Sequence, residues 1–506
     1  MTYGVLAEAI VQTVPHFYGA ISGKCGTINI SLLQDWIQYR PPVCHGKGSA
    51  YYKRRLVRGG AMHRLVIKKL GPIEQCEMEC SQFMTLTGFQ ASGKSTIAKA
   101  IYYFRTIKDD IINLARTQAY NSVPVGGLET EFDVVYGTSL RKGLENYLRE
   151  KFMRTFGSSW GMSNEMCMEY SFTNTCSVKV SLKEDNEFSS PNYIWITLSE
   201  DLKKFLRKKN HGFTVTPLGV FDEDIKKLKT ELCEIFDDDC SVVYIPAGRS
   251  MITLLSQQFG YIYATMDGVQ KRSLDYCTKD YLERILRIKS EFTEGLQGLT
   301  AYYRGKTTLS PKLIQQALNL IEKILRGTYR YSNGEEQIVL GNGKYVKINF
   351  SSSGQQECVW ILNLLFYYLL QQNPILFIIE EPESHLFPES QKYITELIAL
   401  VSNWKHSVVL TTHSPYVLGT LNNLLYVHTI PGKHSKEADK IIPMSIWLDD
   451  RRFDSWFVKN GTAENCMDAE LHMIQNERID EISKVINTEF DELLSLQETD
   501  EEGEDL

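Results

Sequence analysis

The sequence predicts an α/β fold of two lobes with a mixed α/β insertion between them, and three observations support this prediction. Residues 83–87 have the pattern of an apolar strand that runs into a glycine-rich loop and then a helical stretch. Residues 374–379 form a second apolar run with the length of a buried parallel strand, and this run ends in acidic residues. A long stretch of chain separates the two segments, so we expect a large insertion between the lobes.

Length and composition limit the class of protein. The chain has 506 residues and 43% hydrophobic content, which is enough for one large domain or two to three ordinary ones. The longest apolar run, from Cys358, is broken by Gln371, Gln372, Asn373 and Pro374 and falls short of the roughly 18 residues of a membrane span. Glu8 lies where a secretory signal needs an apolar core. We therefore expect a cytoplasmic protein with no membrane partner.

The cysteines favour reduced thiols. All 11 are scattered and none belongs to a CxxC pair, which is not the pattern of a disulfide framework. Cys76 and Cys80 are the nearest pair, but no second Cys or His pair lies close to them in the sequence. We expect buried thiols at these positions and no zinc site.

Charge is distributed unevenly along the chain. The net charge of −7 argues against a wholly basic nucleic-acid-binding surface, but a local basic patch stays open. A solvated helix face is favoured over nucleic-acid contact for one basic stretch, which consists of Lys203, Lys204, Arg207, Lys208 and Lys209. The acidic C-terminal end predicts a solvated tail, with Glu498, Asp500, Glu501, Glu502, Glu504 and Asp505.

Changes in pattern along the chain suggest five segments. Residues 1–61 are an atypical extension, and Met62 is a hypothetical native start because the codons for Arg58–Met62 can spell a bacterial ribosome-binding site before an ATG. Strand-like residues 63–70 and 83–87 then open the first lobe. The expected division is lobe I at 62–135, the insertion or arm at 136–330, lobe II at 331–430 and a C-terminal segment at 431–506.

The glycine-rich loop matches the phosphate-binding pattern GxxxxGK[ST] in full. It follows an apolar strand and opens a helix, which is the context that this motif requires. Lys94 is expected to reach the β- and γ-phosphates of ATP, and Ser95 to bind Mg²⁺. The remaining nucleotide-binding residues are expected to be Gly88, Gln90, Ala91, Ser92, Gly93 and Thr96.

The second apolar strand ends in the acidic sequence 380–383. Glu380 is expected to hold Mg²⁺ through water, although Asp is commoner at this position. Glu381 is expected to orient or deprotonate the attacking water. Glu383 adds a third carboxylate, and three such groups after six apolar residues would repel one another without a cation.

A serine- and glutamine-rich segment, 351–357, precedes an apolar helix. Ser353 and Gln356 have the spacing of a capping box. The segment resembles the LSGGQ signature of ABC-type ATPases, with Gln355 in place of the second glycine. That resemblance implies that Ser353, Gly354 and Gln356 contact the nucleotide held by the phosphate loop of another copy. It therefore implies a homodimer or higher oligomer.

His413 follows the strand-like residues 407–412 and precedes Ser414 and Pro415, an ordinary helix cap and first turn. His413 resembles the ABC switch histidine, which touches the γ-phosphate. The order of the motifs GFQASGKST, SSGQQE, FIIEEPESHLFP and TTHSP resembles the SMC/RecF/OLD branch of ABC ATPases over about residues 62–430. Within that branch it most closely resembles the stand-alone ATPases of bacterial anti-phage systems such as Septu and PARIS.

The resemblance implies a P-loop NTPase of the ABC/SMC head type that uses ATP and Mg²⁺. The insertion has no sustained heptads and does not resemble the long coiled coil of a chromosome-maintenance protein. Transport is disfavoured because far more sequence separates the motifs of the two lobes than the compact cassette of an ABC transporter needs. The sequence has no nuclease pattern. The resemblance implies that the effector, such as a nuclease, is a separate chain. The role of Arg249, in the segment 243–250, stays open: it could sense phosphate, pair with a carboxylate or be an ordinary loop residue.

Three functions remain open at this stage. The first is an ATPase switch or scaffold subunit of an anti-phage defence complex. The second is a DNA-repair or maintenance ATPase that resembles RecF and closes on DNA. The third keeps ATP as a structural ligand of an oligomer with negligible turnover. Copurification with a nuclease separates the first from the second, and turnover of Glu381→Gln against wild type separates the third.

Overall fold

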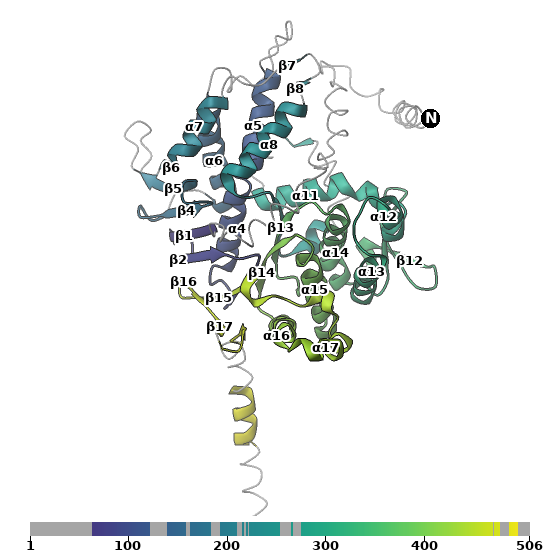
Figure 1. The fold of residues 1–506 in the computed structure, drawn as a ribbon. Helices are drawn as coiled ribbons and strands as arrows, with labels where there is room; N and C mark the ends of the chain where they lie inside the picture. Colours follow the sequence, from purple (N-terminus) through teal and green to yellow (C-terminus); the bar gives the residue numbers. More distant parts are fainter. Residues whose placement is uncertain are drawn as a thin grey trace, which may run out of the picture. The chain divides into compact units, whose positions relative to one another are not determined.

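The computed structural model describes residues 63–121, 139–157, 162–183, 193–209, 215–216, 219–220, 222–253, 265–266, 275–468, 470–475 and 485–493 (Figure 1). The expected extension, the hypothetical start at Met62 and the acidic residues of the tail lie outside the described residues. Among the described helices, none is both long and apolar enough to cross a membrane.

A six-stranded sheet carries the segments that the sequence analysis singled out. Four strand pairs in it are parallel and one is antiparallel, in the order β16-β15-β3-β14-β13-β9. The strands are β3 (Phe83–Gly88), β9 (Ser241–Ile245), β13 (Ile375–Glu380), β14 (Ser407–Thr412), β15 (Phe453–Lys459) and β16 (Thr462–Asn465). Because β3, β9, β13 and β14 run parallel, the loops that follow them lie at one edge of the sheet, where α/β proteins bind ligands.

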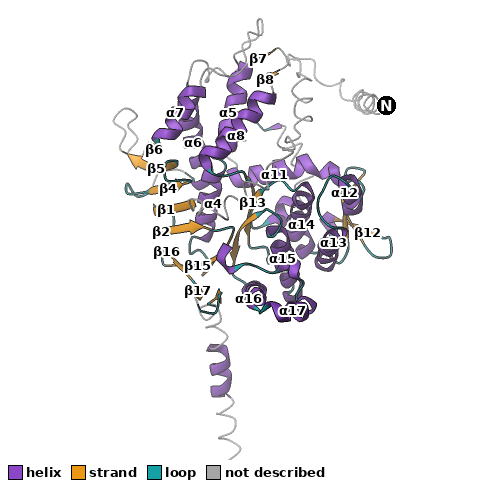
Figure 2. Cartoon of the chain, in the orientation of Figure 1, coloured by secondary structure: helices purple, strands orange, loops and turns teal. Residues whose placement is uncertain are grey.

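A second sheet is antiparallel, with strand order β2-β1-β4-β5-β6 (Figure 2). Its strands are β1 (His63–Leu70), β2 (Ile73–Cys80), β4 (Cys167–Ser171), β5 (Ser177–Lys183) and β6 (Tyr193–Leu198). Buried and partly exposed residues alternate along β5, as expected for a sheet with one face on the core. Cys76 and Cys80 lie buried on β2, and burial raises the pKa of their thiols to about 12 and about 11.

Smaller strands and the helices complete the described fold. The strands β10 (Thr328–Ser332), β11 (Glu335–Val339) and β12 (Tyr345–Lys347) form a sheet, and β7 (Val215–Thr216) with β8 (Gly219–Val220) and β17 (Met467–Asp468) with β18 (Met473–Ile474) form two pairs. The helices are α4 (Lys94–Arg105), α5 (Ile107–Asn121), α6 (Leu140–Phe156), α7 (Glu200–Lys209), α8 (Asp222–Phe236), α11 (Tyr276–Ile288), α12 (Gly295–Tyr303), α13 (Pro311–Leu325), α14 (Ser353–Gln371), α15 (Pro388–Ser402), α16 (Pro415–Thr429) and α17 (Ser435–Ile441).

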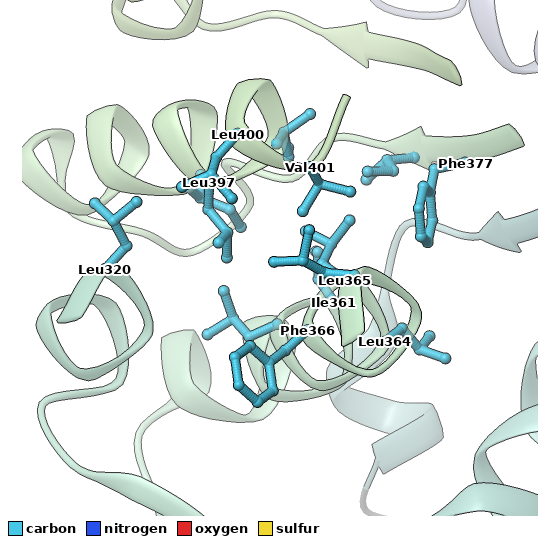
Figure 3. Close-up of a cluster of buried hydrophobic side chains, with 14 of the residues drawn as sticks. Leu320, Ile361, Leu364, Leu365, Phe366, Phe377, Leu397, Leu400 and Val401 are labelled. Carbon is cyan, nitrogen blue, oxygen red and sulfur yellow. The ribbon is translucent and has the colours of Figure 1, made fainter. Parts of the chain in front are cut away.

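The apolar helix predicted after the signature segment is α14, and it lies in a large hydrophobic core. Ile361 and Leu365 of α14 pack among Leu397 and Val401 of α15 and Phe377 of β13 (Figure 3). All five side chains are buried. This core fixes α14, and with it the signature segment at its first turn, against the strand that ends in the acidic residues.

The strand pairing differs from the expected division into lobes and insertion. Strands β4, β5 and β6, assigned to the insertion at 136–330, extend the sheet that β1 and β2 begin. Strand β9, from the same segment, pairs with β13 in the six-stranded sheet. Strand β15, beyond the expected end of lobe II at residue 430, pairs in parallel with β3. The boundaries at 135/136 and 430/431 therefore divide sheets, because strand pairing joins segments that are distant in sequence.

Candidate functional site

The phosphate loop, residues 88–96, connects β3 to α4 as the sequence predicted. Two of its glycines are sterically required. Gly88 has φ +137°, and a Cβ there would lie 2.2 Å from the Val458 carbonyl oxygen of β15. Gly93 caps α4 with φ +109°, and a Cβ there would lie 2.3 Å from the Cδ1 of Ile73. The loop can therefore curl tightly against both sheets only with glycine at these positions.

Lys94 is the first residue of α4 and is 5% exposed. Its ammonium donates to the carbonyl oxygens of Gly88 at 3.0 Å and Phe89 at 2.7 Å. Burial lowers the pKa of Lys94 to about 8, against the opposing pull of the nearby carboxylates of Glu381, Glu383 and Glu380. Ser95, the predicted Mg²⁺ ligand, follows on the first turn of α4 and is exposed.

The lowered pKa of Lys94 predicts a pH dependence of ATP binding. Below pH about 8 the free protein already carries the lysine charge that phosphate attracts. Above that pH, binding requires uptake of a proton, so we expect affinity for ATP to fall by about tenfold per pH unit. Fluorescence titrations across this range would measure the slope.

Lys94→Arg is the control for this prediction, because a guanidinium does not titrate in the same range. Its affinity should stay constant with pH, whatever its absolute value. An equally flat profile for the wild-type protein would show that Lys94 is charged throughout and that burial does not lower its pKa.

Glu380 ends β13 and is 5% exposed. One carboxylate oxygen, Oε2, accepts from the backbone N–H of Ala247 at 3.3 Å. The other oxygen, Oε1, is buried and accepts no hydrogen bond by geometry among the described residues, and the buried Tyr244 hydroxyl, whose pKa is raised by burial and then by the Glu380 charge, lies beside this carboxylate. A buried carboxylate oxygen without a donor is costly unless a cation faces it. The residues present therefore fit the Mg²⁺ that the sequence analysis expected at Glu380.

Glu381, His413 and Lys94 form a short chain of polar contacts. The Nε2 of His413, at the end of β14, lies 3.4 Å from the Oε1 of Glu381, and its Nδ1 lies 3.5 Å from the Lys94 ammonium. The contact with His413 holds the pKa of Glu381 below its usual value. Three residues from distant parts of the sequence thus meet at the carboxyl edge of the sheet, and the carboxylate is charged at neutral pH.

Glu383 belongs to the site, although the sequence pattern assigned it no separate role. It is 9% exposed, and burial raises its pKa. Its Oε1 accepts from the Thr412 hydroxyl at 2.7 Å and from the backbone N–H of His413 at 2.9 Å. Glu383 therefore fixes the backbone that carries His413. The run of carboxylates in 380–383 was the only sequence signal for this role.

The signature segment differs in detail from the predicted capping box. Ser352, and not Ser353, caps α14, and its partner is Gln355 instead of Gln356. Ser353 is consequently the exposed first residue of the helix. The Gln356 side chain donates to the Ile348 and Ser351 carbonyl oxygens at 3.1 and 3.0 Å.

Gly354 lets the first turn of α14 approach the loop after the acidic residues. A Cβ at this position would lie 2.8 Å from the carbonyl oxygen of His385. Among hydrogen bonds and ion pairs of the described residues, none joins Ser353, Gly354 or Gln356 to the phosphate loop. The structure of one chain therefore brings together Lys94, Glu380, Glu381 and His413, and the signature residues make no hydrogen bond or ion pair to these four among the contacts of the described residues.

Arg249, which the sequence left open, pairs with a carboxylate. Its Nη2 lies 3.1 Å from the Oε1 of Glu357, and the side chains are 0% and 1% exposed. A side chain without solvent exposure does not present a charge to a phosphate in solution, so the observed pairing replaces the phosphate-sensing alternative. Glu357 was not singled out by the sequence, because a glutamate near a helix start is ordinary.

The basic stretch forms the last part of α7 and has ion-pair partners. Lys203 contacts Glu200 at 2.8 Å, and Lys209 contacts Glu231 of α8 at 2.5 Å. The Lys203–Glu200 pair, one turn apart on α7, is typical of a solvated helix face, whereas the Lys209–Glu231 pair joins α7 to α8 and is only 18% and 30% exposed. They favour the solvated-face interpretation over contact with nucleic acid.

Comparison with known proteins adds a family match over the same region. Residues 62–418 match the family described as "AAA ATPase domain". No curated protein matches the chain.

Solved structures of SMC head domains are similar to this chain at low identity. One is an SMC head bound to the C-winged helix domain of ScpA, with 11% identity, coverage of 80% of this chain and 96% of that chain, and a TM-score of 0.34. The SMC head domain from Thermotoga maritima has 12% identity, coverage of 80% and 98%, and a TM-score of 0.31. A head domain derived from Pyrococcus furiosus, with an extended coiled coil and bound to the C-terminal domain of ScpA, has 12% identity, coverage of 84% and 99%, and a TM-score of 0.33.

Proposed function

Because the chain belongs to the AAA ATPase domain family, we propose that it binds ATP with Mg²⁺ and hydrolyses it at a site that a second copy completes. The observation that carries this proposal is the contact chain from Lys94 through His413 to Glu381, beside the buried, unpartnered oxygen of Glu380. A merely structural nucleotide site would need the lysine and the loop but not a charged glutamate aligned by a histidine.

Each residue has a distinct task in this proposal. The backbone of Gly88, Gln90, Ala91, Ser92, Gly93 and Thr96 surrounds the phosphates. Lys94 leaves the Gly88 and Phe89 carbonyl oxygens to bind the β- and γ-phosphates. Ser95 and Glu380 would hold Mg²⁺, which would supply positive charge beside the phosphate oxygens. Glu381 takes a proton from the attacking water or orients it, and His413 aligns that carboxylate and contacts the γ-phosphate.

A second copy would supply Ser353, Gly354 and Gln356 at the first turn of α14. Ser353 is exposed in the single chain, and the N-terminus of a helix of 19 residues attracts an anion. Exposed aromatic side chains adjoin each motif loop, with Phe89 52%, Phe350 81%, Phe387 74% and Tyr416 55% exposed. Large apolar residues concentrated beside polar loops are typical of a protein interface. These features support a homodimer closed by ATP.

The first test is ATP turnover of the wild-type protein, measured together with its mass in solution. We expect phosphate release that depends on Mg²⁺. We also expect a shift from monomer to dimer when ATP is added under conditions that keep turnover slow, such as omission of Mg²⁺. Binding of ATP with no phosphate release, at any protein concentration, would instead favour ATP as a structural ligand.

The biological role that we propose is a switch or scaffold subunit of an anti-phage defence complex, with a separate effector such as a nuclease. It rests on the resemblance of the four motifs to such ATPases. Copurification of the chain with the product of a neighbouring nuclease gene would support it. Dependence of turnover on DNA, without such a partner, would favour the alternative of a repair ATPase that resembles RecF.

A further inference from the structure

The buried pair Arg249 and Glu357 lies between the acidic residues and the signature segment. We propose that Arg249 is a positioning residue for the catalytic glutamate: it fixes the backbone of Glu381, and Glu357 links it to the first turn of α14. This inference rests on the proposed ATPase function, since Arg249 acts only through Glu381.

The guanidinium of Arg249 is surrounded by backbone acceptors. Nη1 donates to the carbonyl oxygens of Glu380 at 2.5 Å and Pro246 at 2.6 Å. Nη2 donates to the carbonyl oxygen of Glu381 at 2.8 Å, and Nε to that of Glu357 at 3.1 Å. The planar fork of an arginine suits such a set of acceptors, and a lysine would reach fewer of them.

Glu381 needs this support because its backbone is in an unfavourable conformation. Its φ is +42°, in the left-handed region that residues other than glycine rarely adopt. Such a conformation persists only where surrounding contacts fix it. Arg249 holds the carbonyl groups of Glu380 and Glu381, on both sides of the strained residue, while the Glu381 N–H donates to the Thr411 carbonyl oxygen at 3.0 Å. Without Arg249 we expect the peptide to relax and the carboxylate to leave His413.

Glu357 connects this support to the signature segment. It lies on α14 one turn after Ser353, and its carboxylate accepts from the backbone N–H groups of Arg249 at 2.9 Å and Ser250 at 2.6 Å. The Thr253 hydroxyl donates to the Gln356 carbonyl oxygen at 3.0 Å. A shift of the first turn of α14 therefore moves Arg249 and the backbone of Glu381. Contact of Ser353 with nucleotide in a second copy would thus change the position of the chain's own catalytic glutamate.

The test compares Arg249→Gln, Glu381→Gln and the double variant for ATP affinity and turnover. We expect Arg249→Gln to keep its Kd for ATP within about threefold of wild type and to lose about 10²-fold in kcat, the loss typical of a misplaced catalytic group. In the double variant the two losses should not multiply, because both act on the same carboxylate. Arg284→Gln is the control: it removes a partly buried guanidinium that binds the Tyr368 hydroxyl and the Val242 carbonyl oxygen, outside the acidic loop, and should retain kcat.

Two outcomes would overturn the inference: a kcat for Arg249→Gln within about threefold of wild type, or losses that multiply in the double variant. If Arg249→Gln does not fold, Glu357→Gln serves in its place: it removes the charge, and its single amide oxygen can accept from only one of the backbone N–H groups of Arg249 and Ser250. It should lower kcat by about tenfold with an unchanged Kd for ATP, and an unchanged kcat would equally overturn the inference. Absence of ATP turnover in the wild-type protein would contradict the proposed function itself. The wild-type measurement therefore distinguishes failure of the proposed function from failure of this inference.

Discussion

Substitution of Glu381 by glutamine should lower kcat by about 10²- to 10⁴-fold, the contribution usual for a general base. Glutamine keeps the size of the side chain but removes the charge that accepts a proton. The lowered pKa of Glu381 places its ionised form at neutral pH, so the loss should be seen at pH ~7. Quenched-flow or steady-state phosphate release would measure it.

The same variant should retain ATP and accumulate as a closed dimer, because the phosphate loop and Lys94 are unchanged. Mass measurement with radiolabelled ATP would show both effects. Glu389→Gln is a matched control: Glu389 lies on α15, is exposed and pairs with Arg326 at 2.9 Å, away from the acidic loop. Wild-type turnover in Glu381→Gln would show that this carboxylate is not the catalytic base.

Substitution of Ser353 by arginine should abolish turnover without weakening ATP binding to the single chain. Ser353 is exposed, so the larger side chain has room in the monomer, but a cation of this size would block a second copy at the first turn of α14. We expect ATP to bind and the dimer to fail. Ser290→Arg, which adds the same charge at an exposed position on the segment Lys289–Phe292, is the control and should dimerise normally.

Mixing the Ser353→Arg chain with a Lys94→Ala chain tests whether the site is shared. Each variant alone should be inactive, since one lacks a signature and the other a phosphate-binding lysine. A mixed dimer has one intact site, formed by the phosphate loop of the first chain and the signature of the second. Because Ser353→Arg chains do not pair with one another and each mixed dimer has one intact site of two, turnover should reach at most about half that of the wild-type protein. A mixed dimer that forms on ATP addition but shows no turnover would contradict the shared site.

Local sequence was sufficient to predict the α/β P-loop fold class and the strand ends that carry the candidate site. The strands that end at Gly88, Glu380 and Thr412 are short apolar runs flanked by motif residues, so neighbouring residues are enough to predict them. Parallel strands place their carboxyl ends together, and this geometry alone predicts that Lys94, Glu380, Glu381 and His413 lie near one another. The family match over 62–418 supports the same nucleotide-binding fold.

The cap of α14 shows where local patterns are ambiguous. Ser352 and Ser353 are each followed three residues later by a glutamine, so the sequence allows two capping boxes in adjacent registers. Tertiary contacts select one of them. The Gln355 amide donates to the Leu325 carbonyl oxygen at 2.7 Å, and the Gln356 amide donates to that of Ile348. Ser353 is left exposed as a result, which is the condition for the role that we propose for it.

The sequence by itself determined the phosphate loop, the acidic end of β13 and the position of His413 directly after β14, because each is marked by neighbouring residues with a fixed local geometry. Only the tertiary structure decided that β9 pairs with β13, that β15 pairs with β3, and that Arg249 and Glu357 form a buried pair behind Glu381. The physical reason is separation along the chain: strand pairing and the pairing of buried charges depend on which distant segments the core brings together. An isolated arginine or glutamate carries no local sign of its partner.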